Sequence, residues 1–130
     1  MYVLDTNTLI FYLKGMGNVA ERFLATQPKD IAIPSITVFE LQVGIAKSNA
    51  PKKRSGQLAG LLAVANVLPF GAAEAGIASQ IKATLDQQGL PIGPFDLLIA
   101  ATALANSGTL VTHNLKEFRR VPNLRLEDWY

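Results

Sequence analysis

The chain has 130 residues, 49% of them hydrophobic and 17% charged, with a formal net charge of +2 at pH 7. This length fits one domain, residues 1–130, and the composition excludes extensive disorder. The absence of cysteine excludes disulfides and thiolate metal sites and suits a cytoplasmic protein, and without a leader-like start or an apolar run of about 18 residues we expect no secretion signal and no transmembrane helix.

Short apolar runs alternate with longer amphipathic segments. In chain order the pattern predicts a strand over 2–4, helices over 6–14 and 19–26, a strand over 31–33, helices over 36–47 and 54–66, a strand over 67–70, helices over 72–88 and 95–106, a strand over 109–112, a helical turn over 115–118 and a strand over 124–126. Asn18 and Ser35 are expected helix N-caps, and Gly15 is expected to end the first helix.

The alternation of strands and helices predicts an α/β fold. Most of the expected strands are continuous apolar runs, which is typical of a parallel sheet covered by helices on both faces. Pro69 places its strand at an edge, because proline cannot donate to a central ladder.

Three acidic residues occupy unusual positions. Asp5 follows the first strand, Glu40 lies within an apolar helical segment, and Asp96 opens another. Asp5 can be explained as a helix cap, and Asp96 as a favourable charge near a helix N-terminus. Glu40 is harder to explain, because an unpaired carboxylate on an apolar face is costly. A shared cation accounts for all three acids.

A cluster of carboxylates suits Mg²⁺ or Mn²⁺, which prefer hard oxygen ligands and can activate water and stabilise the departing oxygen of a phosphodiester. Thr6, Asn7, Thr112 and Asn114 can supply neutral oxygens or orient the ligands. The chain has one histidine, His113, so a histidine-rich zinc site is excluded. We interpret His113 as structural or substrate-contacting rather than as a general base.

Basic residues gather in two segments. The candidate phosphate contacts are Lys52, Lys53 and Arg54 in one segment, beside Lys47, and Arg119 and Arg120 in the other, beside Lys116. Either group can equally be a solvated loop or helix end. Contact with a nucleic-acid backbone is the functional alternative, and charge alone does not separate the two.

Five blocks in order resemble one family over essentially the whole chain. They are LDTNTLI, SITVFELQVG, PIGPFDLLIAATALA, LVTHNLKEF and LRLEDW. The first block alone is weak, because an aspartate after a strand is common. Together the blocks resemble the PIN-domain ribonucleases, and more narrowly the VapC toxins of type II toxin–antitoxin (VapBC) systems.

The resemblance implies a three-layer α/β/α sandwich with a central parallel sheet, and an acidic pocket that binds Mg²⁺ or Mn²⁺ and hydrolyses RNA. By position, Asp5, Glu40 and Asp96 match the family's first three acids. Many PIN domains carry a fourth acid where this chain has Asn114, which weakens the case for a second metal ion. Glu117 is a candidate partial substitute.

The resemblance also implies partners. VapC toxins commonly dimerise and are neutralised by a cognate VapB antitoxin, whose C-terminal segment lies over the active-site groove and whose DNA-binding part represses the operon. Their substrates are often structured RNAs, notably tRNA loops. In this reading the five basic candidates would help to hold RNA.

Two alternatives stay open at the sequence level. DTNT loosely resembles the DxDxT loop of phosphatases that use an aspartate nucleophile, although Asn7 then replaces the general acid. A PIN-like scaffold that only binds RNA or protein is the other. The retained acids argue against it, whereas Asn114 leaves room for it.

Overall fold

The computed structural model describes residues 1–130 and contains one sheet of five parallel strands. The strands are β1 (Tyr2–Leu4), β2 (Ile31–Pro34), β3 (Asn66–Leu68), β4 (Thr109–Val111) and β5 (Arg125–Glu127). Their order is β3-β2-β1-β4-β5, and Val3 of β1 pairs in register with Ala32 of β2 and Leu110 of β4. The expected edge position of the strand near Pro69 is confirmed.

Helices connect the strands. They are α1 (Thr6–Lys14), α2 (Val19–Leu24), the short 3₁₀ helix η1 (Pro28–Asp30), α3 (Ser35–Ala46), α4 (Pro51–Leu62), α5 (Ala72–Gln88), α6 (Pro94–Ala105) and α7 (Leu115–Phe118). The expected element types and order are confirmed. None of the helices is long and apolar enough to cross a membrane.

Two local expectations about helix starts are wrong, and a third holds only in position. Helix α4 begins three residues earlier than expected, because Pro51 sits at its first turn, where proline costs no hydrogen bond. Ser35 is the first residue of α3. Pro34 occupies the N-cap position before it and makes no side-chain capping bond. Asn18 is the N-cap of α2, as expected, but it makes no capping bond, because its side-chain amide donates to the backbone oxygen of Tyr130.

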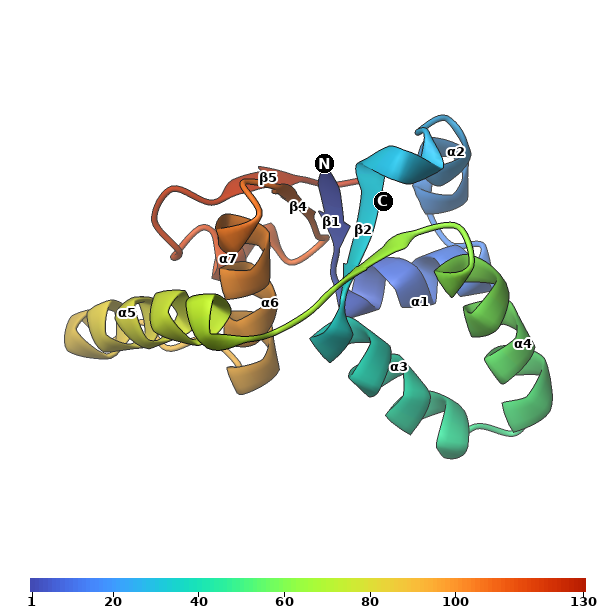
Figure 1. Cartoon of the computed structure of the whole chain (residues 1–130), viewed down its shortest axis with the longest axis horizontal. Helices are drawn as coiled ribbons and strands as arrows, with labels where there is room; N and C mark the ends of the chain where they lie inside the picture. The colour runs from blue at the N-terminus through green and yellow to red at the C-terminus, as the bar shows by residue number, and fades with distance from the viewer.

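The strands send successive side chains to opposite faces, which builds two separate cores. Val3 and Leu110 face one core, whereas their neighbours Leu4 and Val111 face the other. Figure 1 shows the sheet between α5, α6 and α7 on one side and α1 to α4 on the other. This arrangement confirms the three-layer α/β/α sandwich.

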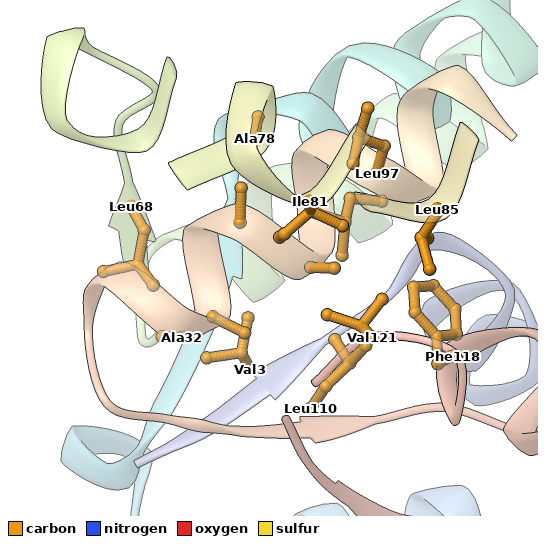
Figure 2. Close-up of a cluster of buried hydrophobic side chains, with 14 residues drawn as sticks. Val3, Ala32, Leu68, Ala78, Ile81, Leu85, Leu97, Leu110, Phe118 and Val121 are labelled. Carbon is orange, nitrogen blue, oxygen red and sulfur yellow. The ribbon is translucent and has the colours of Figure 1, made fainter. Parts of the chain in front are cut away.

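The core under α5 and α6 is drawn in Figure 2, where Ile81 and Leu85 of α5 point towards the sheet and Phe118 of α7 closes the end. Phe118 and Leu85 are each 1% exposed. Complete burial of such a side chain contributes about 1.5–3 kcal/mol. These contacts fix α6, and with it Asp96, against the carboxyl ends of the strands.

The order of the strands reverses beside β1. From β1 the chain moves outward through β2 and β3, and it then crosses to β4 and β5 on the other side. Ligands of open parallel sheets bind outside the carboxyl ends of the strands at such a reversal. The crevice therefore lies beyond Leu4 and Val111, the last residues of β1 and β4.

Candidate active site

Asp5 lies at the centre of the reversal, directly after β1. Its backbone N–H donates to the Val111 carbonyl of β4 over 3.2 Å, and its Oδ1 accepts from the Thr8 N–H over 2.9 Å. Asp5 is therefore the N-cap of α1, and only 3% of it is exposed. The capping interpretation of Asp5 is confirmed. The capping bond uses Oδ1, and Oδ2 does not take part in it.

Glu40 approaches the same region from α3. Thr37, one turn earlier on that helix, is fully buried and donates to the Leu4 carbonyl over 3.4 Å, which ties α3 to the end of β1. Residues three apart lie on one helical face, so Glu40 also faces the site. The Thr6 hydroxyl donates to Glu40 Oε1 over 2.6 Å and orients the carboxylate.

Asp96 enters from the opposite helical layer as the third residue of α6, after the N-cap Gly93. Glu117 of α7 reaches the same place, because its Oε1 accepts from the Gly93 N–H over 2.7 Å. Its Oε2 accepts from the Asn114 side-chain amide over 2.8 Å. The structure thus brings Glu117, a minor sequence candidate, next to Asp96.

The acids at this edge repel one another. Burial, and then the charges of Glu117, Asp5 and Glu40, raise the pKa of Asp96 to about 6. Burial also raises the pKa of Asp5, a rise that hydrogen bonds from Thr112 and Thr8 oppose and the Glu40 charge supports. None of the four carboxylates forms an ion pair within the chain. The site therefore holds negative charge that a cation would stabilise.

The polar candidates behave differently from one another. Thr112 is fully buried, and its hydroxyl accepts from the Asn114 N–H over 3.0 Å, which shapes the turn after β4. Asn7 is exposed and makes no side-chain hydrogen bond. Sequence reasoning missed Thr8. Its backbone N–H donates to the capping side chain of Asp5, and its hydroxyl donates to the Val111 carbonyl over 3.1 Å. Its position three residues after a potential N-cap was the available signal.

The donor set fits a hard divalent cation. The charged candidate ligands are all carboxylates, whose oxygens Mg²⁺ and Mn²⁺ prefer. No group of three or more acidic or histidine side chains is close enough together in this structure to hold a metal ion without some rearrangement. Mg²⁺ keeps several water ligands and takes one or two carboxylates, so an open arrangement suits it better than zinc.

The basic candidates separate in space. Arg54 lines a hollow that also contains Glu40, whereas Lys52 and Lys53 are exposed outside it. Arg120 donates to the Pro91 carbonyl over 2.6 Å and so holds the loop before α6, while Arg119 is exposed beyond α7.

His113 packs against the C-terminal segment of the chain. Its ring stacks on Tyr130 with centroids 4.4 Å apart, and its Nδ1 lies 2.9 Å from Asp128 Oδ2. These contacts tie the C-terminal segment to the turn after β4. They favour the structural interpretation of this side chain.

Comparison with known proteins agrees with the fold. The family model "PIN domain" matches residues 2–124. The chain therefore belongs to the PIN-domain family, and its relatives within that family are VapC ribonucleases.

Two relatives and one solved structure illustrate the similarity. The chain is 42% identical over 129 residues to a "tRNA(fMet)-specific endonuclease VapC" of Shigella flexneri, covering 98% of this chain and 97% of the relative. It is 38% identical to a "Ribonuclease VapC2" of Rickettsia felis, with 99% and 98% covered. A crystal structure of VapBC2 from Rickettsia felis, bound to a DNA fragment from their promoter, superposes with a TM-score of 0.92 at 37% identity, covering 99% and 98%.

Proposed function

We propose that this chain is a metal-dependent endoribonuclease that hydrolyses RNA phosphodiester bonds. Asp5, Glu40 and Asp96 would hold Mg²⁺, and Mn²⁺ would substitute for it. One observation carries the proposal: one strand end and three helices bring four carboxylates without cationic partners to the sheet's reversal point in a PIN-domain chain. Residues 1–130 would form a single PIN domain.

The chain's own residues would prepare the site. Asp5 is held rigidly, because its Oδ1 accepts the bond that caps α1. Its second oxygen, Oδ2, does not take part in that bond. Thr6 fixes Glu40 through Oε1, which leaves Oε2 for a ligand. Asp96 accepts no side-chain or capping hydrogen bond, so its oxygens are available. When bound, the cation would polarise the phosphate and a nucleophilic water and stabilise the departing oxygen.

Glu117 would support the cation site without binding the cation itself. Its two oxygens are occupied by Gly93 and Asn114, so it holds the turn after β4 against the start of α6. Its charge also raises the pKa of Asp96. We therefore propose that Glu117 and Asn114 position the site, as do Thr6 and Thr112, rather than bind a second ion.

The relatives suggest the partners. We propose that a VapB-type antitoxin neutralises the chain, that the toxin forms a homodimer, and that their complex binds promoter DNA through the antitoxin. The relative from Shigella flexneri is named for tRNA(fMet), so initiator tRNA is the first substrate to test. An RNA substrate of this kind would place the activity in the cytoplasm.

The decisive experiment is RNA cleavage by wild type and by Asp5→Asn, Glu40→Gln and Asp96→Asn variants. Initiator tRNA and an elongator tRNA are incubated with Mg²⁺ or Mn²⁺, with and without chelator. We expect each variant to lose on the order of 100-fold or more in rate, and chelator to abolish cleavage by wild type. Asp86→Asn on the exposed side of α5 is the matched control and should cleave normally.

The proposal fails if wild type cleaves equally well in chelator, or if the three variants keep the rate of Asp86→Asn. Initiator tRNA cut no faster than the elongator would remove only the substrate assignment.

A further inference from the structure

A groove of about 500 Å³ extends from Glu40 along the outer helices α1, α3 and α4. Figure 1 shows these three helices on the same side of the sheet. Glu40 lies at its wall together with Leu41 and Ile45 of α3, and Ile10 of α1 faces them. The groove is therefore continuous with the acidic edge and large enough to hold part of a substrate.

The groove carries a concentration of positive charge. Lys14 at the end of α1, Lys47 just after α3 and Arg54 in the first turns of α4 all line it. None of these three side chains forms an ion pair with an Asp or Glu. Arg54 instead donates to Gln57 on its own helix over 3.2 Å. The groove thus offers three uncompensated cations beside one carboxylate.

The start of α4 adds to this field. Ala50, its N-cap, lines the groove, and no side chain caps the helix. The first turn contains no acid and several cations, an arrangement that opposes the helix dipole and lowers helix stability. An anion in the groove would relieve that repulsion and accept from the unsatisfied N–H groups.

We propose that this groove binds the RNA strand next to the cleaved bond. The backbone phosphates would lie on Lys14, Lys47, Arg54 and the start of α4, and a ribose or base would lie against Leu41 and Ile45. The inference rests on the proposed ribonuclease function, because Glu40 belongs to both the groove and the metal site. It assigns substrate binding to Lys14 and Lys47, and separates Arg54 from Lys52 and Lys53.

The other candidate occupant is an acidic, partly apolar peptide. The groove contains three cations, which suit the phosphates of RNA, and Glu40, one of the three candidate metal ligands, lines it. A strand that extends past Glu40 into the groove meets the three cations that line it. RNA therefore fits both the charge and the position of the groove.

The first test measures RNA affinity without cleavage. A fluorescent single-stranded RNA is titrated with Lys47→Gln/Arg54→Gln in chelator, at several salt concentrations. We expect at least 10-fold weaker binding than wild type, and a salt slope shallower by about 1.4, since each phosphate contact to single strands contributes about 0.7. Lys29→Gln/Arg125→Gln loses the same charge away from the groove and should bind within twofold of wild type.

The second test fills the groove without changing charge. Gly44 of α3 lines the groove, and a side chain added there meets no atom within 4 Å. Gly44→Leu should fold at least as well as wild type, because leucine favours helices, and yet bind RNA at least 10-fold more weakly. Gly56→Leu on α4 is the control, since Gly56 is equally open but lies outside the groove.

The outcomes separate the groove from the catalytic proposal. Cleavage by wild type combined with normal RNA affinity of both groove variants overturns the groove and keeps the ribonuclease. RNA binding by wild type that the groove variants lose, without any metal-dependent cleavage, keeps the groove and overturns the ribonuclease. Groove variants that lose an acidic peptide but not RNA would assign the groove to a protein partner and overturn the inference.

Discussion

At the scale of single residues, Asp5 shows that a cap and a candidate ligand can be the same side chain. Its Oδ1 satisfies the Thr8 N–H at the start of α1, and that bond fixes the carboxylate after β1. Burial raises the pKa of Asp5, so ionising it costs free energy in the absence of a counter-charge. Asp96 carries the same conflict with no protein donor at all.

The ionisation of Asp96 makes the metal-free protein less stable at high pH. Its pKa is raised from 3.8 to about 6, so the stability it contributes is complete below pH 4 and is lost as pH rises through 6. Asp96→Asn should remove that loss. Without divalent ions at pH 7.5, we expect the free energy of unfolding of the variant to exceed that of wild type by on the order of 1 kcal/mol. This figure allows for solvent screening of a half-buried group.

The measurement is urea unfolding in chelator at pH 4, 5, 6 and 7.5. The advantage of Asp96→Asn should shrink towards zero at pH 4, where the wild-type carboxyl is protonated. Asp86→Asn, in an exposed ion pair on α5, should show no such trend. An advantage that is constant across this pH range would contradict the assigned charge repulsion.

At the scale of elements, helix ends decide where functional groups lie. Helix α1 begins at the cap Asp5 and ends at Gly15, whose φ of 66° is left-handed. The Gly15 and Met16 N–H groups donate to carbonyls of the last turn, over 3.2 and 2.9 Å. This stop places Lys14, the last residue of α1, at the groove wall.

Replacing the terminal glycine should loosen that end. Gly15→Ala places a Cβ in a left-handed conformation, and we expect a loss of about 1 kcal/mol in the free energy of unfolding. Gly56→Ala, within α4 and equally open, should instead gain up to about 1 kcal/mol. Denaturant unfolding of both variants checks the pair. A stabilising Gly15→Ala would show that the left-handed conformation is not required.

At the scale of the whole molecule, the sheet assembles the site from both helical layers. Glu40 comes from α3 on one face, whereas Asp96 and Glu117 come from α6 and α7 on the other, and Asp5 lies between them after β1. The repulsion among these acids works against folding of the metal-free chain. A cation bound only by the folded state should therefore stabilise the whole molecule.

Mg²⁺ should raise the midpoint of thermal unfolding. At 100 times its dissociation constant, a ligand of the native state adds about 2.7 kcal/mol. We expect this rise for wild type, and its absence for an Asp5→Asn/Asp96→Asn double variant. The measurement is a thermal scan at increasing MgCl₂, with equal ionic strength kept by NaCl. An equal rise for the double variant would place the ion elsewhere.

Some of the molecule could be predicted from local pattern, and some could not. Helix 72–88 was predicted to the residue, because Gly89, which takes a left-handed conformation, ends it. Asn18 takes the expected N-cap position, but a tertiary partner overrides its capping bond, because its side chain bonds the C-terminal Tyr130. The cap expected at Ser35 was wrong, because Ser35 is already the first residue of α3. Glu117 was underrated because its carboxylate meets Asp96 only after β4 and α6 pack together.

The sequence by itself determined the alternation of strands and helices, the parallel sheet and the three acids, because periodicity and local charge are properties of short segments. Only the tertiary structure decided which groups meet. It placed Arg54 and Glu40 in the lining of one groove, and it packed His113 against the C-terminal segment. The physical reason is that a side chain's electrostatic and hydrogen-bonding neighbours come from segments distant in the chain, which local sequence patterns do not encode.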